Sequence, residues 1–322
     1  MPRILLTNHY SAEVLKVVEA LVPEGFEFSS LPGATPEALL EAAPQADYFL
    51  ASGRLRINAE VLAAATHLRM VQRTGVGTDG LDADTLRARQ IPVYVNRGVN
   101  ARSVAEHTLM LTLAALRKLP AVHARTRMGV WRKNETGLEC HSLHGKRVGL
   151  VGLGNIGKLV AQMFRPFGVE LCYHKPQRLS ESGERELEVR YLDLAELLKT
   201  SDVVCLLCPL NEQTRNLINR ETLAMMKPGS LLVNTARGPI VNLSDLSDAL
   251  HSGHLAGAAL DVFEQEPIPK DAPILSAPNT ILTPHVGGLT IETFSTMISD
   301  AFRNISLFHQ GQTQQIAYSR WI

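Results

Sequence analysis

The chain has 322 residues, of which 45% are apolar and 20% are charged. This composition excludes wholesale disorder and predicts a sizeable buried core, divided between about two domains of roughly 150 residues each. The 32 basic and 32 acidic residues balance to a formal charge of +0, with no long block of one sign. The sequence therefore shows no basic cluster of the kind that binds nucleic acid or an anionic membrane.

The N-terminus has no hydrophobic signal segment, and no stretch reaches the roughly 18 apolar residues of a membrane helix. The four cysteines are too few for a disulfide framework, so we expect reduced thiols and a soluble cytoplasmic protein. Cys205 and Cys208 form a C-x-x-C inside residues 203–209, which have the composition of a buried strand. A structural role is therefore favoured over a zinc or redox site, and no metal site is predicted.

The first hundred residues alternate short apolar runs with helical patterns. Strands are predicted at 4–7, 48–51, 70–73 and 92–96, and helices at 12–21, 36–42, 59–65 and 83–88. This alternation predicts a parallel sheet with helices packed on it.

The segment 104–116 is apolar almost all round, which is typical of a helix buried on several sides, and we expect it between two domains. The polar stretch 125–145 that follows is expected to be irregular. A second alternation then predicts a second parallel sheet. Its strands are expected at 147–151, 170–174, 203–207, 230–234, 257–260 and 280–283.

A last helix is predicted at 292–308, because apolar residues recur there at intervals of three and four. They are Phe294, Met297, Ile298, Ala301, Phe302 and Ile305. Such a face needs a sheet to cover, and the second sheet ends at 283. We therefore infer that this helix returns to the first domain. The expected division is a discontinuous domain, 1–100 with 288–322, around a second domain, 101–287.

Residues 150–157 run from a strand through G-x-G-x-x-G into a helix. Gly152 permits the tight turn, Gly154 lets the backbone approach a pyrophosphate, and Gly157 lets helix and strand pack closely. Within a complete strand-helix-strand frame, this motif predicts a Rossmann domain that binds a dinucleotide.

The second strand of such a domain usually ends at an acidic residue that holds the ribose 2′-hydroxyl. Here that position is His174, followed by Lys175 and Arg178. Because both cations suit a 2′-phosphate, we expect NADP in preference to NAD. The alternative is that these charges are solvated and the protein accepts either cofactor.

Arg237, Glu266 and His285 follow successive strands of the second predicted sheet, at the edge where open α/β sheets bind ligands. Hydride transfer to a ketone builds negative charge on the carbonyl oxygen, so a proton donor and a positive group are needed. His285 suits the donor role, and a carboxylate such as Glu266 would fix its tautomer. Arg237 offers a planar fork to a substrate carboxylate. Each residue alone has an ordinary structural explanation; the set together favours a reductase.

Six ordered motifs resemble those of the D-isomer-specific 2-hydroxyacid dehydrogenases, the family with D-3-phosphoglycerate dehydrogenase and glyoxylate/hydroxypyruvate reductase. They lie at residues 74–79, 100–106, 150–157, 234–238, 261–267 and 283–285, and the resemblance covers essentially the whole length of the chain. The resemblance implies an α/β fold with two doubly wound parallel-sheet domains: a Rossmann coenzyme domain and a flavodoxin-like, discontinuous substrate domain. It also implies a homodimer, and Arg237, Glu266 and His285 as the catalytic trio.

Together with the glycine turn and the basic loop, the resemblance gives a set of expected cofactor contacts. They are Ser103, Gly152, Gly154, Asn155, Ile156, Gly157, His174, Lys175, Arg178, Cys208, Pro209, Thr235, Ala236, Asp261 and Gly288. It also implies that the backbone of Val76 and Gly77 holds the substrate carboxylate, with Arg237 and His285. Arg54 is a candidate for a second carboxylate or a phosphate, or else a solvated charge.

The expected reaction is NAD(P)-dependent reduction of a small 2-oxo acid, with glyoxylate or hydroxypyruvate preferred. Oxidation of D-3-phosphoglycerate is an alternative, less favoured because the chain ends at Ile322 with no room for a regulatory domain and because the ribose loop is basic. A non-catalytic NAD(H)-sensing module is a second alternative, but the complete trio favours turnover.

Overall fold

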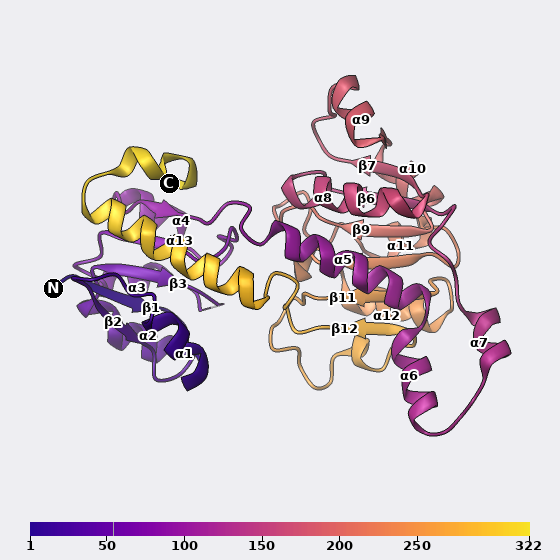
Figure 1. Ribbon diagram of the computed structural model, residues 1–322, viewed down its shortest axis with the longest axis horizontal. Helices are drawn as coiled ribbons and strands as arrows, with labels where there is room; N and C mark the ends of the chain where they lie inside the picture. The colour runs from indigo at the N-terminus through magenta and orange to yellow at the C-terminus, as the bar shows by residue number, and fades with distance from the viewer. Residues whose placement is uncertain (54) are drawn as a thin grey trace. The chain divides into compact units, whose positions relative to one another are not determined.

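The computed structural model describes residues 1–53 and 55–322. They form two compact units: unit 1 combines Met1–Asn100 with Leu289–Ile322, and unit 2 is Ala101–Gly288. In each unit, helices cover both faces of a sheet whose paired strands are all parallel (Figure 1). The predicted fold class, α/β with two doubly wound sheets, is confirmed.

Unit 1 contains a five-stranded sheet in the order β2-β1-β3-β4-β5. This is the flavodoxin-like order, in which the chain winds outwards in both directions from the β1/β3 pair. The strands are β1 (Arg3–Leu6), β2 (Glu27–Ser30), β3 (Tyr48–Ala51), β4 (Met70–Arg73) and β5 (Val93–Tyr94). The helices are α1 (Ala12–Glu19), α2 (Pro36–Ala42), α3 (Ala59–Ala64), α4 (Ala83–Ala88) and α13 (Ile291–His309).

Helices enclose this sheet because its central strands are apolar on both faces. Leu5 and Val71 pack with α2, α3 and α4 on one face. Ile4 and Leu50 pack with α1 and α13 on the other. The apolar stripe of α13 covers the sheet of unit 1 with Ile298, Ala301, Phe302 and Ile305.

Unit 2 contains a seven-stranded sheet in the order β12-β11-β10-β9-β6-β7-β8. Read from β8 and numbered from β6, this is the Rossmann order with one further parallel strand. The strands are β6 (Arg147–Val151), β7 (Glu170–His174), β8 (Val189–Tyr191), β9 (Val203–Leu206), β10 (Leu231–Asn234), β11 (Gly257–Leu260) and β12 (Thr280–Leu282). The helices are α5 (Ala101–Leu116), α6 (Leu119–Arg127), α7 (Lys133–Glu139), α8 (Asn155–Phe164), α9 (Glu181–Leu187), α10 (Leu194–Thr200), α11 (Arg220–Met225) and α12 (Leu243–His251).

Strand β9 shows how one strand supplies two cores in unit 2. Val203 and Cys205 point to the face that α5 and α8 cover, whereas Val204 and Leu206 point to the face that α10, α11 and α12 cover. Helix α5 packs against α8 and against β10, β11 and β12 (Figure 1). The buried helix expected from the apolar segment 104–116 therefore lies on the Rossmann sheet.

Some local predictions are wrong. Strands β2 and β8 are absent from the predicted set, because β2 is a half-exposed edge strand with two serines and β8 has only three residues. The stretch 125–145 is not irregular: α6 extends into it and α7 lies inside it. Neither helix has a buried residue, so no apolar stripe marks them in the sequence.

Within the described part of the chain, no helix combines the length and apolar character needed to span a bilayer.

Candidate active site

Six strands of unit 2 end side by side. The register pairs His174 with Val151, Val151 with Leu206, and Leu206 with Asn234, and the row continues through Leu260 to Leu282. Each of these is the last residue of its strand. Because the strands are parallel, the loops after them leave from one edge of the sheet, the edge at which open α/β sheets bind ligands. Every predicted site residue of unit 2 except Ser103, in the first turn of α5, ends or follows one of these strands.

Three glycines at the junction of β6 and α8 have different structural effects. Gly152 has a φ of 105°, and a Cβ there would lie 2.6 Å from the backbone nitrogen of Cys208. A Cβ on Gly157 would lie 2.5 Å from the carbonyl oxygen of Gly152. A Cβ on Gly154 would meet no described atom within 4 Å. At Gly154 the missing side chain therefore keeps space open rather than relieving a contact within the protein.

Gly154 is also the N-cap of α8, where no described side chain accepts a hydrogen bond. The N–H groups of Asn155, Ile156 and Gly157 point out of the first turn without an intrahelical acceptor. Open space, directed N–H groups and the positive end of a helix dipole are what a pyrophosphate requires. The residues present fit the diphosphate of a dinucleotide.

The basic loop after β7 is held by Glu184 on α9. Arg178 donates to this carboxylate through Nε and Nη2, both at 2.8 Å, and its guanidinium lies 5.4 Å from the ring centre of Tyr191. The hydrogen bond from Arg178 lowers the pKa of Glu184 to about 2. The orientation of the Arg178 guanidinium is therefore fixed, and its Nη1 can still donate to a ligand.

His174 and Lys175 differ from Arg178 in their contacts. His174 Nδ1 lies 3.1 Å from the carbonyl oxygen of Leu192. Because a carbonyl oxygen only accepts, Nδ1 carries the hydrogen and the neutral ring keeps Nε2 as an acceptor. The ammonium group of Lys175 has no hydrogen-bond or ion-pair partner among the residues that the structure describes.

The loop after β10 is folded by Asn234, the last residue of that strand. The Asn234 side chain accepts from the N–H of Ala236 and donates to the carbonyl oxygen of Arg237, both at 3.0 Å. Nη1 of Arg237 donates to the carbonyl oxygen of Ala236 at 2.7 Å. The buried amide of Asn234 thus sets the turn from which Arg237 extends.

Gly238 brings two functional loops together. A Cβ at this position would lie 1.9 Å from the carbonyl carbon of Phe263 and 2.3 Å from the backbone nitrogen of Glu264. The loop that carries Arg237 therefore lies directly against the loop that carries Glu266.

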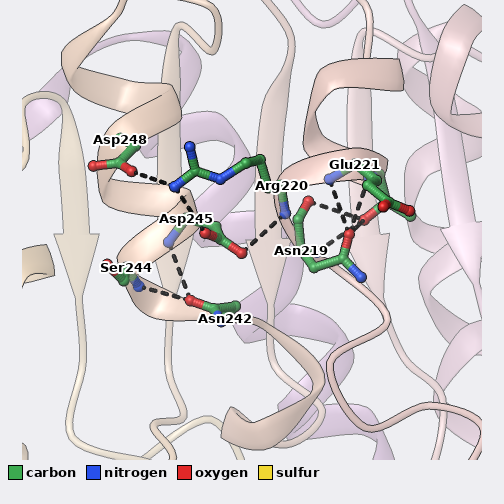
Figure 2. Close-up of polar contacts among 8 residues, drawn as sticks. Asn219, Arg220, Glu221, Asn242, Ser244, Asp245 and Asp248 are labelled. Carbon is green, nitrogen blue, oxygen red and sulfur yellow. Dashed lines mark hydrogen bonds and ion pairs between the residues drawn. The ribbon is translucent and has the colours of Figure 1, made fainter.

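The residues that directly follow Gly238 are held by a second set of contacts. Segments 216–218 and 239–241 are joined by backbone hydrogen bonds and a parallel bridge. Figure 2 shows that Arg220 joins the helices that follow these segments, α11 and α12. Its backbone N–H donates to Asp245 and its Nη2 to Asp248, both at 3.0 Å.

Glu266 and His285 form a hydrogen-bonded pair. Nδ1 of His285 lies 2.9 Å from Oε2 of Glu266, whose Oε1 accepts from the N–H of Phe263 at 2.7 Å. An ionised carboxylate only accepts, so Nδ1 carries the hydrogen and Nε2 is the ring nitrogen left for a ligand. The His285 side chain is 38% exposed and that of Glu266 is 10% exposed, so the imidazole is the accessible member of the pair.

The backbone at His285 is left-handed, with a φ of 57°, and Asp261 holds it there. Asp261 accepts from the N–H groups of Val286 at 2.9 Å and Gly287 at 2.8 Å, and from the hydroxyl of Thr283 at 2.6 Å. Burial by itself raises the pKa of Asp261, but the hydrogen bonds that it accepts outweigh burial and lower it. An ionised Asp261 thus fastens the chain on both sides of His285.

In unit 1, Val76 and Gly77 follow β4. Nε of Arg73, the last residue of that strand, donates to the carbonyl oxygen of Gly77 at 2.8 Å. No described residue accepts a hydrogen bond from the backbone N–H of Val76 or Gly77. Adjacent N–H groups of this kind suit an anion. Arg54, the further candidate for substrate binding, lies outside the described residues.

Comparison with known proteins decides the family. Residues 109–287, more than half of the chain, match the family described as D-isomer specific 2-hydroxyacid dehydrogenase, NAD binding domain. The chain belongs to the D-isomer-specific 2-hydroxyacid dehydrogenases. The family is one of nicotinamide-dependent oxidoreductases, and the matched residues lie in unit 2, which carries the glycine turn.

Individual relatives of this chain differ in name and in length. It is 36% identical over 313 residues to D-3-phosphoglycerate dehydrogenase of Mycobacterium bovis; the match covers 97% of this chain but 58% of that relative. It is 35% identical over 316 residues to glyoxylate reductase of Korarchaeum cryptofilum, covering 97% and 94%. The solved structure of an NADPH-dependent glyoxylate/hydroxypyruvate reductase from Sinorhizobium meliloti, in complex with citrate, superposes with a TM-score of 0.81 at 30% identity, covering 96% and 95%.

Several residues that shape the candidate site could not be identified from the sequence pattern. Asn234 and Thr283 lie within recognised motifs but had no assigned role, and Glu184 lies on a helix that was not predicted. His107, whose Nε2 lies 3.4 Å from Asp261, follows a motif without belonging to it. Each of these residues either contacts a loop that is distant in sequence or holds a neighbouring residue in place. Such contacts cannot be inferred from the spacing of residues in the sequence.

Proposed function

We propose that this protein reduces a small 2-oxo acid, glyoxylate or hydroxypyruvate, and in reverse oxidises the corresponding D-2-hydroxy acid. The observation that carries the proposal is the 2.9 Å pair of His285 and Glu266, on the strand edge that also bears Arg237 and the glycine turn. A nicotinamide cofactor, when bound, donates or accepts the hydride.

His285 is the proton donor in the direction of reduction. Negative charge builds on the carbonyl oxygen of the substrate as the hydride arrives, and Nε2 supplies a proton to that oxygen. Glu266 holds Nδ1 and thereby fixes the ring and its tautomer throughout. Arg237 binds the carboxylate of the substrate and stabilises the developing charge.

The backbone after β4 supplies a candidate group for the substrate. We propose that the N–H groups of Val76 and Gly77 bind the substrate carboxylate. The 35% identity to a glyoxylate reductase, over 94% of that relative, supports a small 2-oxo acid.

We propose NADP as the preferred cofactor. Lys175, which has no described ion-pair partner, and the fixed fork of Arg178 supply positive charge where a 2′-phosphate needs it. Glu184 opposes this preference, because it already neutralises Arg178. His174 Nε2 suits a ribose hydroxyl, so NAD remains usable.

Initial rates of NADPH and NADH oxidation with glyoxylate, hydroxypyruvate, phenylpyruvate and 2-oxoglutarate test the reaction. We expect the highest kcat/KM with glyoxylate or hydroxypyruvate. His285→Ala should lower kcat by about a thousandfold, because it removes the proton donor. His67→Ala, at an exposed histidine before β4, is the control and should leave the rates unchanged. Equal rates for His285→Ala and the parent would contradict the mechanism.

Oxidation of D-3-phosphoglycerate is the second candidate, favoured by the 36% identity to phosphoglycerate dehydrogenases. Reduction of NAD⁺ or NADP⁺ by D-3-phosphoglycerate with higher kcat/KM than by D-glycerate would select it. Cofactor binding without turnover of any acid would instead indicate a sensing module.

The double variant Lys175→Glu with Arg178→Ala tests the cofactor preference. We expect the ratio of kcat/KM for NADPH over NADH to fall by roughly a hundredfold, since two charge-assisted contacts to the phosphate are lost. Arg190→Ala is a matched control, because Arg190 is an exposed arginine on β8 that is paired with Glu170. An unmoved ratio would mean that the two charges are solvated.

We also propose a cytoplasmic homodimer. Helices α6 and α7 and the loop between them carry exposed apolar side chains, with Trp131 81% and Leu138 89% exposed, which suits a protein partner. The four cysteines are free thiols, which suits a reducing compartment.

A further inference from the structure

Two consecutive residues of α5 reach two different functional loops of unit 2. His107 contacts the loop after β12, which carries His285, and Thr108 contacts the loop after β10, which carries Arg237. Neither residue takes part in the mechanism proposed above.

The contact of His107 has a defined direction. The Thr283 hydroxyl lies 2.6 Å from Oδ1 of Asp261, and because a carboxylate only accepts, its one hydrogen points there. The oxygen of that hydroxyl is then the acceptor for Nε2 of His107, at 3.1 Å. The same Nε2 lies 3.4 Å from Oδ1 of Asp261. His107 therefore donates into the hydrogen bonds that hold both sides of His285.

The contact of Thr108 is equally well defined. Thr108 is fully buried, and its hydroxyl donates to the carbonyl oxygen of Val104 at 2.7 Å. Its oxygen lies 2.8 Å from the hydroxyl of Thr235, which is therefore the donor in that pair. Thr235 directly follows Asn234, the residue that folds the Arg237 turn.

One helix can reach both loops because consecutive helical residues point about 100° apart. Strand β11 separates β10 from β12 in the sheet, and α5 packs across all three. The helix thus bridges loops that are not neighbours.

We propose that His107 and Thr108 are positioning residues that align the proton donor with the arginine through α5. His107 sets the loop of His285, and Thr108 sets the loop of Arg237. The inference rests on the proposed function for its kinetic consequences, but not for its structural ones.

Kinetics of four variants separate the two contacts. His107→Met should lower kcat by roughly tenfold and alter the pH profile of kcat, because the proton donor is displaced. Thr108→Val should raise the KM for the 2-oxo acid by roughly tenfold, because the carboxylate ligand is displaced. His107→Gln and Thr108→Ser keep an N–H or hydroxyl group at the contact and should restore the parent values to within about threefold.

Thr112→Val is the matched control. Thr112 is as fully buried as Thr108, lies one turn along the same helix, and has its hydroxyl on the carbonyl oxygen of Thr108. The same substitution there should leave kcat and KM unchanged. If Thr112→Val reproduces the effect of Thr108→Val, the loss is a general one from α5 and the inference fails.

Amide hydrogen exchange without substrate tests the inference independently of turnover. His107→Met should accelerate exchange in the peptide that contains the amides of Val286 and Gly287, and Thr108→Val in the peptide that contains the amide of Ala236. Unchanged exchange in both peptides would overturn the inference. If the parent protein turns over no 2-oxo acid but the exchange pattern is as expected, the proposed function fails and the positioning role stands.

Discussion

Gly238 shows how one missing side chain shapes the site. Any Cβ there would overlap the backbone of Phe263 and Glu264, which has no rotamer with which to move aside. The loops of Arg237 and Glu266 approach each other only because this residue is glycine. The distance between Arg237 and the Glu266–His285 pair thus depends on Gly238, which has no functional group.

Gly238→Ala should therefore lower kcat/KM by about a hundredfold, because the two loops must separate by an ångström or more. Overpacking should also reduce the free energy of unfolding by about 1–3 kcal/mol. Steady-state rates and urea unfolding measure the two effects. Gly33→Ala is the control, since a Cβ there meets nothing within 4 Å, and it should change neither. A Gly238→Ala protein with parental kcat/KM would show that the loop contact is dispensable.

The two cysteines of the C-x-x-C have different structural positions, one in β9 and one in the turn after it. Cys205 is fully buried beneath α5 and α8, whereas Cys208 lies beyond the strand with its backbone against the turn at Gly152. The two thiols belong to different layers of unit 2. Burial raises the pKa of Cys205 to about 12 and that of Cys208 to about 11.

These raised pKa values predict slow thiol chemistry, since the thiolate is the reactive form and the folded protein keeps both thiols protonated near neutral pH. Iodoacetamide should modify Cys140, which is partly exposed, well before Cys172, Cys205 or Cys208. Peptide mass spectrometry over a time course measures the order. Urea-unfolded protein is the control, in which all four thiols should react alike. Fast modification of Cys208 in the folded protein would contradict the prediction.

At the scale of the whole molecule, the central strands of both sheets could be predicted, whereas some elements at the margins could not. The central strands carry buried apolar runs, so β3, β4, β6 and β7 stand at the residues that the sequence indicates. Edge strand β2 and the exposed helix α7 lack such runs, because nothing packs on them from both sides.

The same division applies to the candidate site. Arg237, Glu266 and His285 could be singled out because each follows a strand that the sequence predicts. The residues that hold them could not, since a contact such as His107 to Thr283 joins residues 176 positions apart. The partner of Arg178 escaped prediction for a different reason: Glu184 is close in sequence but lies on a short helix without a strong apolar pattern.

Unit 2 is inserted into the sequence of unit 1. In each unit, the segments next to the insertion points are held together by a contact. Near the ends of unit 2, a Cβ on Gly287 would lie 3.2 Å from the His107 ring. In unit 1, Asn96 donates to the carbonyl oxygen of Met297 at 2.8 Å, which joins the chain before the interruption to the chain after it. Domains whose ends are adjacent can be inserted into a host without stretching it. Unit 2 is therefore suited to replacement as a whole. If it were exchanged for the same unit of another family member, we expect unit 1 to keep its fold.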